Sequence, residues 1–145
     1  MRALIQRVKS AHVSIDNKTV GSIEEGLLVF LGIKTDDTQE DLEYLFKKII
    51  KCRIFDDAEG VMNESLLDQN KALLVVSQFT LYAETRKGNR PSYKAAAKGE
   101  VAKPLYEKFI ELAKEQDIDV QTGEFGADMD VHLINDGPVT ILLES

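Results

Sequence analysis

Two short polar stretches carry the residue types that could do chemistry. The first ends an apolar run in the middle of the chain and consists of Ser77, Gln78, Phe79 and Thr80. It offers two hydroxyls and an amide, and a bend at the strand end would leave backbone N–H groups unpaired. Such donors can form an oxyanion hole, which stabilises the charge that develops when an ester or amide carbonyl is attacked. The structural alternative is that these side chains only end the strand and satisfy local backbone groups.

The second stretch lies near the end of the chain and reads Asn135-Asp136-Gly137-Pro138. Asp-Gly between strands favours a hairpin turn, but the proline would enter the next strand without a backbone donor. The bond before proline can be cis at a cost of only roughly 0.5–1 kcal/mol, and glycine removes the clash that restricts other residues there. A Gly137-Pro138 step, cis or trans, can therefore hold two carbonyls in a fixed direction.

Other kinds of catalytic site have little support. Ser77 lacks the Gly-x-Ser-x-Gly elbow of a hydrolase triad, and the two histidines, His12 and His132, are far apart in the sequence. The single cysteine, Cys52, favours a structural thiol over a nucleophile and makes a zinc cage improbable. No phosphate loop or dinucleotide fingerprint is present, so we expect neither a metal nor a cofactor.

Composition indicates one domain, residues 1–145, because 145 residues with 43% hydrophobic content suffice for one core and not comfortably for two. We find no apolar stretch of about 18 residues and no signal-peptide pattern, so we expect a cytoplasmic protein without a membrane partner.

The net charge of −7 argues against broad nucleic-acid binding. Residues 85–104 are an exception, because they hold one acid against six bases: Arg86, Lys87, Arg90, Lys94, Lys98 and Lys103. This basic segment is either a solvated surface or a local contact for a polyanion.

The elements that must position these residues follow from periodicity. Residues 1–15 and 19–23 favour a hairpin, residues 26–33 a central strand, and residues 62–67 a short strand. A helix is expected to begin at Asp37, with Glu40 completing its cap, and its apolar face is Leu42, Leu45, Phe46, Ile49 and Ile50. Residues 73–76 form the buried strand that leads into Ser77.

In the second half, residues 88–92 indicate a loop, and a second helical region is expected from about Tyr93 to near Asp117. Within this region Pro104 suits a first-turn position. Residues 129–133 and 139–143 then indicate two strands separated by the Asn-Asp-Gly-Pro turn. Together these elements predict an α+β fold, with a largely antiparallel mixed sheet curled toward a barrel and two principal helices packed against it.

Read together, the two stretches resemble the D-aminoacyl-tRNA deacylase family. The resemblance runs along the whole chain, and three further segments carry it: Met1-Arg2-Ala3-Leu4-Ile5-Gln6-Arg7-Val8, Gly88-Asn89-Arg90-Pro91-Ser92 and Phe125-Gly126-Ala127-x-Met129-x-Val131. It implies hydrolysis of the ester between a D-amino acid, or mischarged glycine, and the 3′ end of tRNA. It also implies a homodimer in which a cis Gly137-Pro138 step reaches into the partner's pocket and rejects L-amino acids.

Within that resemblance, the backbone N–H groups around Phe79 and Thr80 would bind the oxyanion, and Ser77 and Gln78 would orient substrate or water. The 2′-hydroxyl of the terminal ribose would assist the hydrolysis. Thr80 as nucleophile is the competing version. Phe125 and Met129 are candidates for an adenine pocket or for core packing. Arg7 would either brace the Gly-Pro step or face solvent, and Arg86, Lys87, Arg90 and Lys94 are candidate contacts for tRNA phosphates.

Two rival functions remain at this point. A binding module could hold a tRNA 3′ end without hydrolysis, and a general cytosolic hydrolase could cleave small esters or peptides. The pair of hydroxyls at Ser77 and Thr80 favours an enzyme over a binding module. The basic segment and the absence of a triad count against a general hydrolase.

Overall fold

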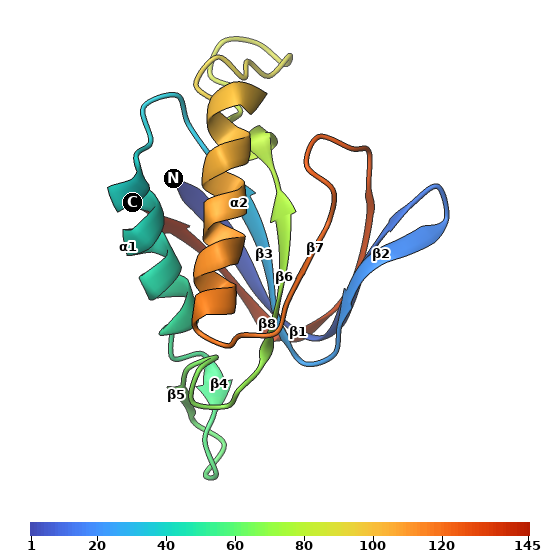
Figure 1. Cartoon of the computed structure of the whole chain (residues 1–145), viewed down its shortest axis with the longest axis vertical. Helices are drawn as coiled ribbons and strands as arrows, with labels where there is room; N and C mark the ends of the chain where they lie inside the picture. Colours follow the sequence, from blue (N-terminus) through green and yellow to red (C-terminus); the bar gives the residue numbers. More distant parts are fainter.

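The computed structural model describes all 145 residues and contains one strongly curved main sheet (Figure 1). Its longest strands are β1 (Arg2–Ile15) and β8 (Asp130–Glu144), which pair antiparallel along their length. The other edge of β1 pairs antiparallel with β3 (Gly26–Gly32) and β2 (Lys18–Ile23). β6 (Ala72–Ser77) then lies parallel to β3, and β7 (Val120–Thr122) lies parallel to β6.

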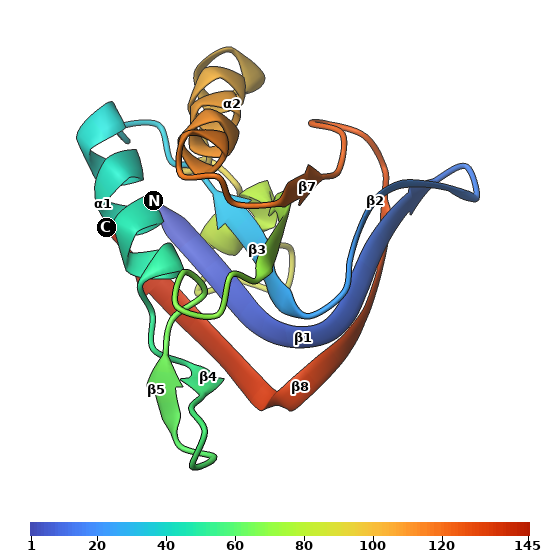
Figure 2. The ribbon, with the colours of Figure 1, turned by 60° about the horizontal axis from the view of Figure 1, so that its bottom comes forward.

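The sheet closes almost into a barrel because its two far strands approach each other. Figure 2 shows β1 and β8 curving together toward the side where β2 and β7 lie. Gly21 of β2 rests against the backbone of Thr122 in β7 with no room for a side chain. The predicted α+β fold, with a largely antiparallel mixed sheet that curls toward a barrel and carries two helices, is confirmed.

Two apolar clusters occupy opposite faces of the central strands. Leu27, Val29 and Leu31 of β3 join a large core with the buried faces of α1 (Gln39–Ile50) and α2 (Gly99–Glu115). Leu28 points the other way, into a smaller cluster with residues of β1, β2 and β6. This alternation explains why residues 26–33 are apolar throughout: β3 is covered on both faces.

The first helix begins one residue later than predicted. Thr38 is its N-cap, and the Thr38 N–H donates to Asp41 at 2.9 Å in a reciprocal capping box. Asp37 is engaged elsewhere, since its buried carboxylate binds the Met1 amino group at 2.7 Å and the Lys34 N–H at 2.7 Å. The predicted apolar face of α1 is confirmed.

The second helix begins at Gly99 rather than near Tyr93, which places Pro104 in its second turn. The preceding backbone pairs with the end of β3 instead of with itself: the Thr35 N–H donates to Ala95 at 3.2 Å and the Ala97 N–H to Ile33 at 2.8 Å. A helix cannot form where its hydrogen-bonding groups are already used. The predicted end near Asp117 agrees with the observed end at Glu115 within the usual variation.

The Asn-Asp-Gly-Pro stretch is not a hairpin turn. β8 continues through it along β1, with irregular register around Val8, and Figure 2 shows the strand bending sharply. The hairpin between β1 and β2 does form, because Asp16 and Asn17 take the positive φ values, 48° and 62°, that such turns favour.

The predicted short strand at 62–67 reduces to β5 (Met62–Glu64), which pairs with β4 (Phe55–Asp56) in a separate small sheet. No helix is long and apolar enough to cross a membrane.

Candidate functional site

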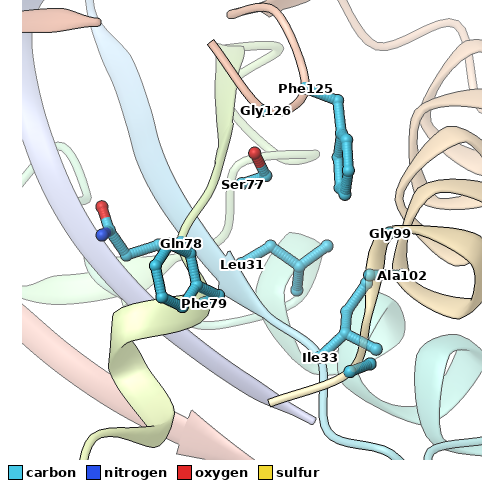
Figure 3. A pocket seen from close by; sticks show the side chains of 10 residues that line it. Leu31, Ile33, Ser77, Gln78, Phe79, Gly99, Ala102, Phe125 and Gly126 are labelled. Carbon is cyan, nitrogen blue, oxygen red and sulfur yellow. The ribbon is translucent and has the colours of Figure 1, made fainter. Parts of the chain in front are cut away.

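The last residue of β6, Ser77, and the two residues after it, Gln78 and Phe79, form the wall between two hollows. The first, of about 180 Å³, lies between the end of β3, the start of α2 and the loop after β7. Figure 3 shows Phe125 facing Ala102 and Gly99 across it. Its lining is mainly apolar and comprises Leu31, Ile33, Ser77, Gln78, Phe79, Ala97, Gly99, Ala102, Phe125 and Gly126.

The second hollow, of about 280 Å³, adjoins the first. It shares Ser77, Gln78, Phe79 and Gly126 with it and is otherwise lined by Val76, Ala127, Asp128, Met129 and Val131. A molecule with two parts could therefore place one part on each side of residues 77–79.

The backbone changes direction at this wall. The Gln78 N–H completes the sheet by donating to Leu31 at 2.8 Å, and a short 3-10 helix, η1 (Phe79–Tyr82), then begins. Its first internal bond runs from the Leu81 N–H to Gln78 at 3.3 Å. The N–H groups of Phe79 and Thr80 precede that bond and have no acceptor within the helix, as at any helix start. These two N–H groups lie at the bend where the sequence predicts oxyanion donors.

The polar side chains of the stretch have distinct surroundings. The Gln78 amide donates to the Thr80 hydroxyl oxygen, and Figure 3 shows Gln78 directed away from Phe125. Ser77 stands beside Gly126 at the boundary of both hollows. No histidine, lysine or carboxylate hydrogen-bonds to Ser77 or Thr80, so neither hydroxyl has a side-chain base within the chain.

Phe125 and Met129, predicted together as an adenine pocket, lie in different hollows. Phe125 lines the first, where its ring centroid is 5.6 Å from that of Tyr106. Tyr106 supports it from the core, donating its hydroxyl to Val75 at 2.9 Å, and burial raises the pKa of Tyr106 to about 12. Met129 lines the second hollow and packs against Gly123.

Gly137 and Pro138 line neither hollow. They lie exposed at the bend of β8, joined by a cis peptide bond. Gly137 has φ 132°, and a Cβ there would stand 2.7 Å from the Val139 side chain. The Asn135 amide spans the bend, donating to the carbonyls of Arg7 at 2.9 Å and Val139 at 3.1 Å. The bend is therefore held by several polar contacts.

Arg7 is buried beneath this bend rather than facing solvent. Its Nε lies 3.3 Å from the Asp136 carbonyl oxygen and 3.1 Å from the Asp136 carboxylate. Its Nη1 donates to the Ile54 carbonyl at 2.6 Å and to Asp56 at 3.2 Å. These contacts fasten the backbone just before Gly137 to the segment that follows α1.

The candidate phosphate contacts lie on an exposed loop at the start of α2 (Figure 1). Glu84 and Ser92 close the loop with reciprocal backbone bonds of 2.8 and 2.9 Å. Arg86 Nε lies 4.0 Å from the Glu84 carboxylate. In contrast, Lys87, Arg90 and Lys94 form no ion pair within the chain.

Sequence reasoning missed the residues that shape the first hollow from the helix side, Gly99 and Ala102. Both are small and three apart, so they fall on one helix face. That spacing is the only signal they give, and it is common on packed helices.

The two histidines, His12 and His132, are distant in sequence but stack at a centroid distance of 4.3 Å across β1 and β8.

Comparison with known proteins gives a consistent result. A family described as D-Tyr-tRNA(Tyr) deacylase matches residues 4–144. Proteins named D-aminoacyl-tRNA deacylase from Thermosipho africanus and Clostridium novyi are 60% and 54% identical over 145 residues, covering 100% of this chain and 97% of each relative.

Two solved structures share the fold of this chain over nearly its whole length. One titled c-Myc DNA Unwinding Element Binding Protein has a TM-score of 0.94 and 42% identity, covering 100% of this chain and 99% of its own. A probable eukaryotic D-amino acid tRNA deacylase has a TM-score of 0.86 at 19% identity, covering 99% and 98%, which shows a shared fold.

Proposed function

Because the chain belongs to the D-Tyr-tRNA(Tyr) deacylase family, we propose that it hydrolyses the ester between a D-amino acid and the 3′ end of tRNA around residues 77–80. The observation that carries this placement is the wall of Ser77, Gln78 and Phe79 between two hollows. An aminoacyl ester has a nucleoside on one side and an amino acid on the other. With the terminal adenosine against Phe125 in the first hollow and the amino acid in the second, the ester carbonyl lies at the wall.

The chemistry needs little beyond positioning, because an aminoacyl ester is already activated. Water attacks the acyl carbon, the N–H groups of Phe79 and Thr80 stabilise the oxyanion, and the bond to the ribose 3′ oxygen breaks. The departing oxygen takes up a proton, and the ribose 2′-hydroxyl assists that transfer. Ser77 and Gln78 orient the water or the ester. This version suits hydroxyls that have no side-chain base.

Thr80 as nucleophile is the competing mechanism, and Thr80→Ala separates the two. The RNA-assisted mechanism expects turnover to survive in this variant and expects no acyl-enzyme in the wild type. Loss of turnover, together with an acyl group found on Thr80 by mass spectrometry, would show that the nucleophile is the threonine.

We further propose that a second copy supplies Gly137 and Pro138 to this pocket. Both residues are exposed and outside their own chain's hollows, and the same strand exposes Ile134 and Leu142 at 58% and 50%. β8 pairs on one side only, and an apolar edge strand of this kind needs a cover. A homodimer joined along β8 covers it and forms two composite sites.

In the composite site the carbonyls of Gly137 and Pro138 hold the substrate's α-amino group and obstruct the direction that an L side chain would take. Selection then works by exclusion. D-amino acids escape the obstruction, and so does glycine, which has no side chain. One pocket can therefore accept many D-amino acids.

The basic loop is the proposed contact for the acceptor stem, with Arg86, Lys87, Arg90 and Lys94 facing its phosphates. Replacing Lys87, Arg90 and Lys94 with alanine should weaken tRNA binding and flatten its salt dependence. Unchanged affinity and salt slope would place the acceptor stem elsewhere. A cytoplasmic location, where charged tRNAs are used, is part of this proposal.

One experiment tests the function as a whole. The protein is incubated with D-tyrosyl-tRNA, L-tyrosyl-tRNA and glycyl-tRNA, and loss of each ester is measured. We expect hydrolysis of the D and glycyl esters and not of the L ester. Equal rates on the D and L esters would refute selection by chirality, and binding without ester loss would favour the non-hydrolytic tRNA-binding module.

A further inference from the structure

An aromatic pair stands exposed at the rim of the first hollow. The rings of Phe79 and Tyr93 meet edge to face, with centroids 5.1 Å apart and planes at 75°. They are 56% and 40% exposed. Phe79 also lines both hollows, so the pair forms a continuous aromatic surface from the pocket to the outside of the protein.

Tyr93 is held in place by the backbone on both sides. The preceding residue, Ser92, exchanges two hydrogen bonds with Glu84, and the Tyr93 carbonyl accepts from the Ala96 N–H at 3.1 Å. Ala95 then pairs with Thr35 next to the end of β3. A side chain on such a framework presents its ring in a defined position, as a stacking surface requires.

We propose that Tyr93, supported by Phe79, stacks the second nucleotide from the 3′ end of the RNA substrate. The inference rests on the proposed function, which places the terminal adenosine in the first hollow. The next nucleotide is one phosphodiester away, so it leaves the hollow across the rim that Phe79 and Tyr93 form.

Charge favours single-stranded RNA over an apolar peptide as the occupant. Lys94 follows Tyr93 directly, Arg90 lies three residues before it, and neither forms an ion pair within the chain. Cations beside an exposed ring match the alternation of phosphate and base along a single strand. Because every base has an aromatic face, such a contact adds affinity without selecting among tRNAs.

The test compares Tyr93→Ala on two substrates. D-tyrosyl-tRNA carries the second nucleotide, and D-tyrosyl-adenosine, the ester of the terminal nucleoside alone, does not. We expect kcat/KM on the tRNA to fall about tenfold, mainly through KM, from the usual contribution of one stacked base. On D-tyrosyl-adenosine we expect a change of less than about twofold, since the lost contact lies outside the nucleoside.

Two further variants serve as controls. Tyr93→Phe keeps the ring and should retain activity on both substrates. Tyr44→Ala removes a tyrosine of α1 that is 50% exposed and should leave both activities unchanged.

Three outcomes would overturn the stacking proposal. The first is that Tyr93→Ala loses kcat/KM equally on both substrates, and the second is that it loses none on D-tyrosyl-tRNA. The third is an altered oligomeric state of Tyr93→Ala in sedimentation. If the wild type hydrolyses neither substrate, the proposed function itself fails.

Discussion

The wall at residues 77–80 and the bend at residues 135–139 differ in what surrounds them. Ser77, Gln78 and Phe79 face two hollows built entirely from their own chain. Gly137 and Pro138 lie exposed on a strand that pairs on one side only. The first region is thus a pair of cavities, whereas the second is an exposed surface.

The two regions are alike in how they are held. Each is braced by one buried polar side chain: Tyr106 donates to Val75, two residues before Ser77, and Arg7 contacts Asp136, next to Gly137. A buried polar side chain from a distant part of the chain therefore helps to hold both the pocket wall and the exposed bend. Their contrast therefore lies in their surroundings, and we propose that it reflects two roles, a pocket in one region and a group supplied to the partner's pocket in the other.

The largest effect is expected from Gly137→Ala. The new Cβ would collide with Val139 and displace the carbonyls that we assign to the substrate's amino group. Because hydrogen bonds to a charged group are worth about 1.5–3 kcal/mol, kcat/KM for D-tyrosyl-tRNA should fall about 10- to 100-fold.

Gly60→Ala is the matched control for that variant, since Gly60 also has positive φ, 77°, but no neighbour within 4 Å. It should keep full activity. If Gly137→Ala remains folded, dimeric and fully selective for the D ester, the bend is an ordinary structural feature.

Ala102→Leu probes the pocket within one chain. Its added carbons would enter the first hollow opposite Phe125, so KM for D-tyrosyl-tRNA should rise about tenfold. Ala102→Ser, which adds one atom, should behave like the wild type. An unchanged KM in the leucine variant would move the nucleoside out of this hollow.

Arg7→Met tests the brace of the exposed bend. It leaves the Ile54 carbonyl without its partner and frees Asp136, so the free energy of unfolding should fall by about 1–3 kcal/mol. Activity should fall a few-fold, because the Gly-Pro carbonyls lose their alignment. Lys9→Met, an exposed change on the same strand, should affect neither urea unfolding nor turnover, and equal behaviour of the two variants would contradict the brace.

The smallest effect is expected from Tyr106→Phe, which removes the brace behind the pocket wall. Loss of the bond to Val75 should cost about 0.5–1.5 kcal/mol. Burial raises the folded pKa of Tyr106 to about 12, above an unfolded value of about 10. The contribution of the protonated Tyr106 to the free energy of unfolding should therefore be fully present below about pH 10 in the wild type. It should be lost as the pH rises through the folded pKa.

Urea unfolding at pH 8, 10 and 11 measures this loss. The phenylalanine variant should show a smaller fall in stability across the series. Parallel pH curves for the two proteins would mean that Tyr106 does not titrate differently on folding.

Local features of this protein follow directly from its sequence. The turn at Asp16-Asn17, the apolar face of α1 and the buried strand before Ser77 each depend on neighbouring residues. The errors came from distant contacts. Asp37 is a good N-cap by type, yet its carboxylate binds Met1, and residues 93–97 pair with the end of β3 instead of starting α2.

The sequence by itself determined which residues could do the chemistry, since hydroxyls, an amide and a Gly-Pro step are properties of residue type and order. Tertiary structure alone decided how they are arranged. It placed Phe125 and Met129 in different hollows and set Gly99 and Ala102 opposite Phe125. It also buried Arg7 and left Gly137 exposed within a continuous strand. The physical reason is that these placements depend on strand register and on a bend in a long pairing. Both are set by packing across the whole sheet rather than by neighbours in the chain.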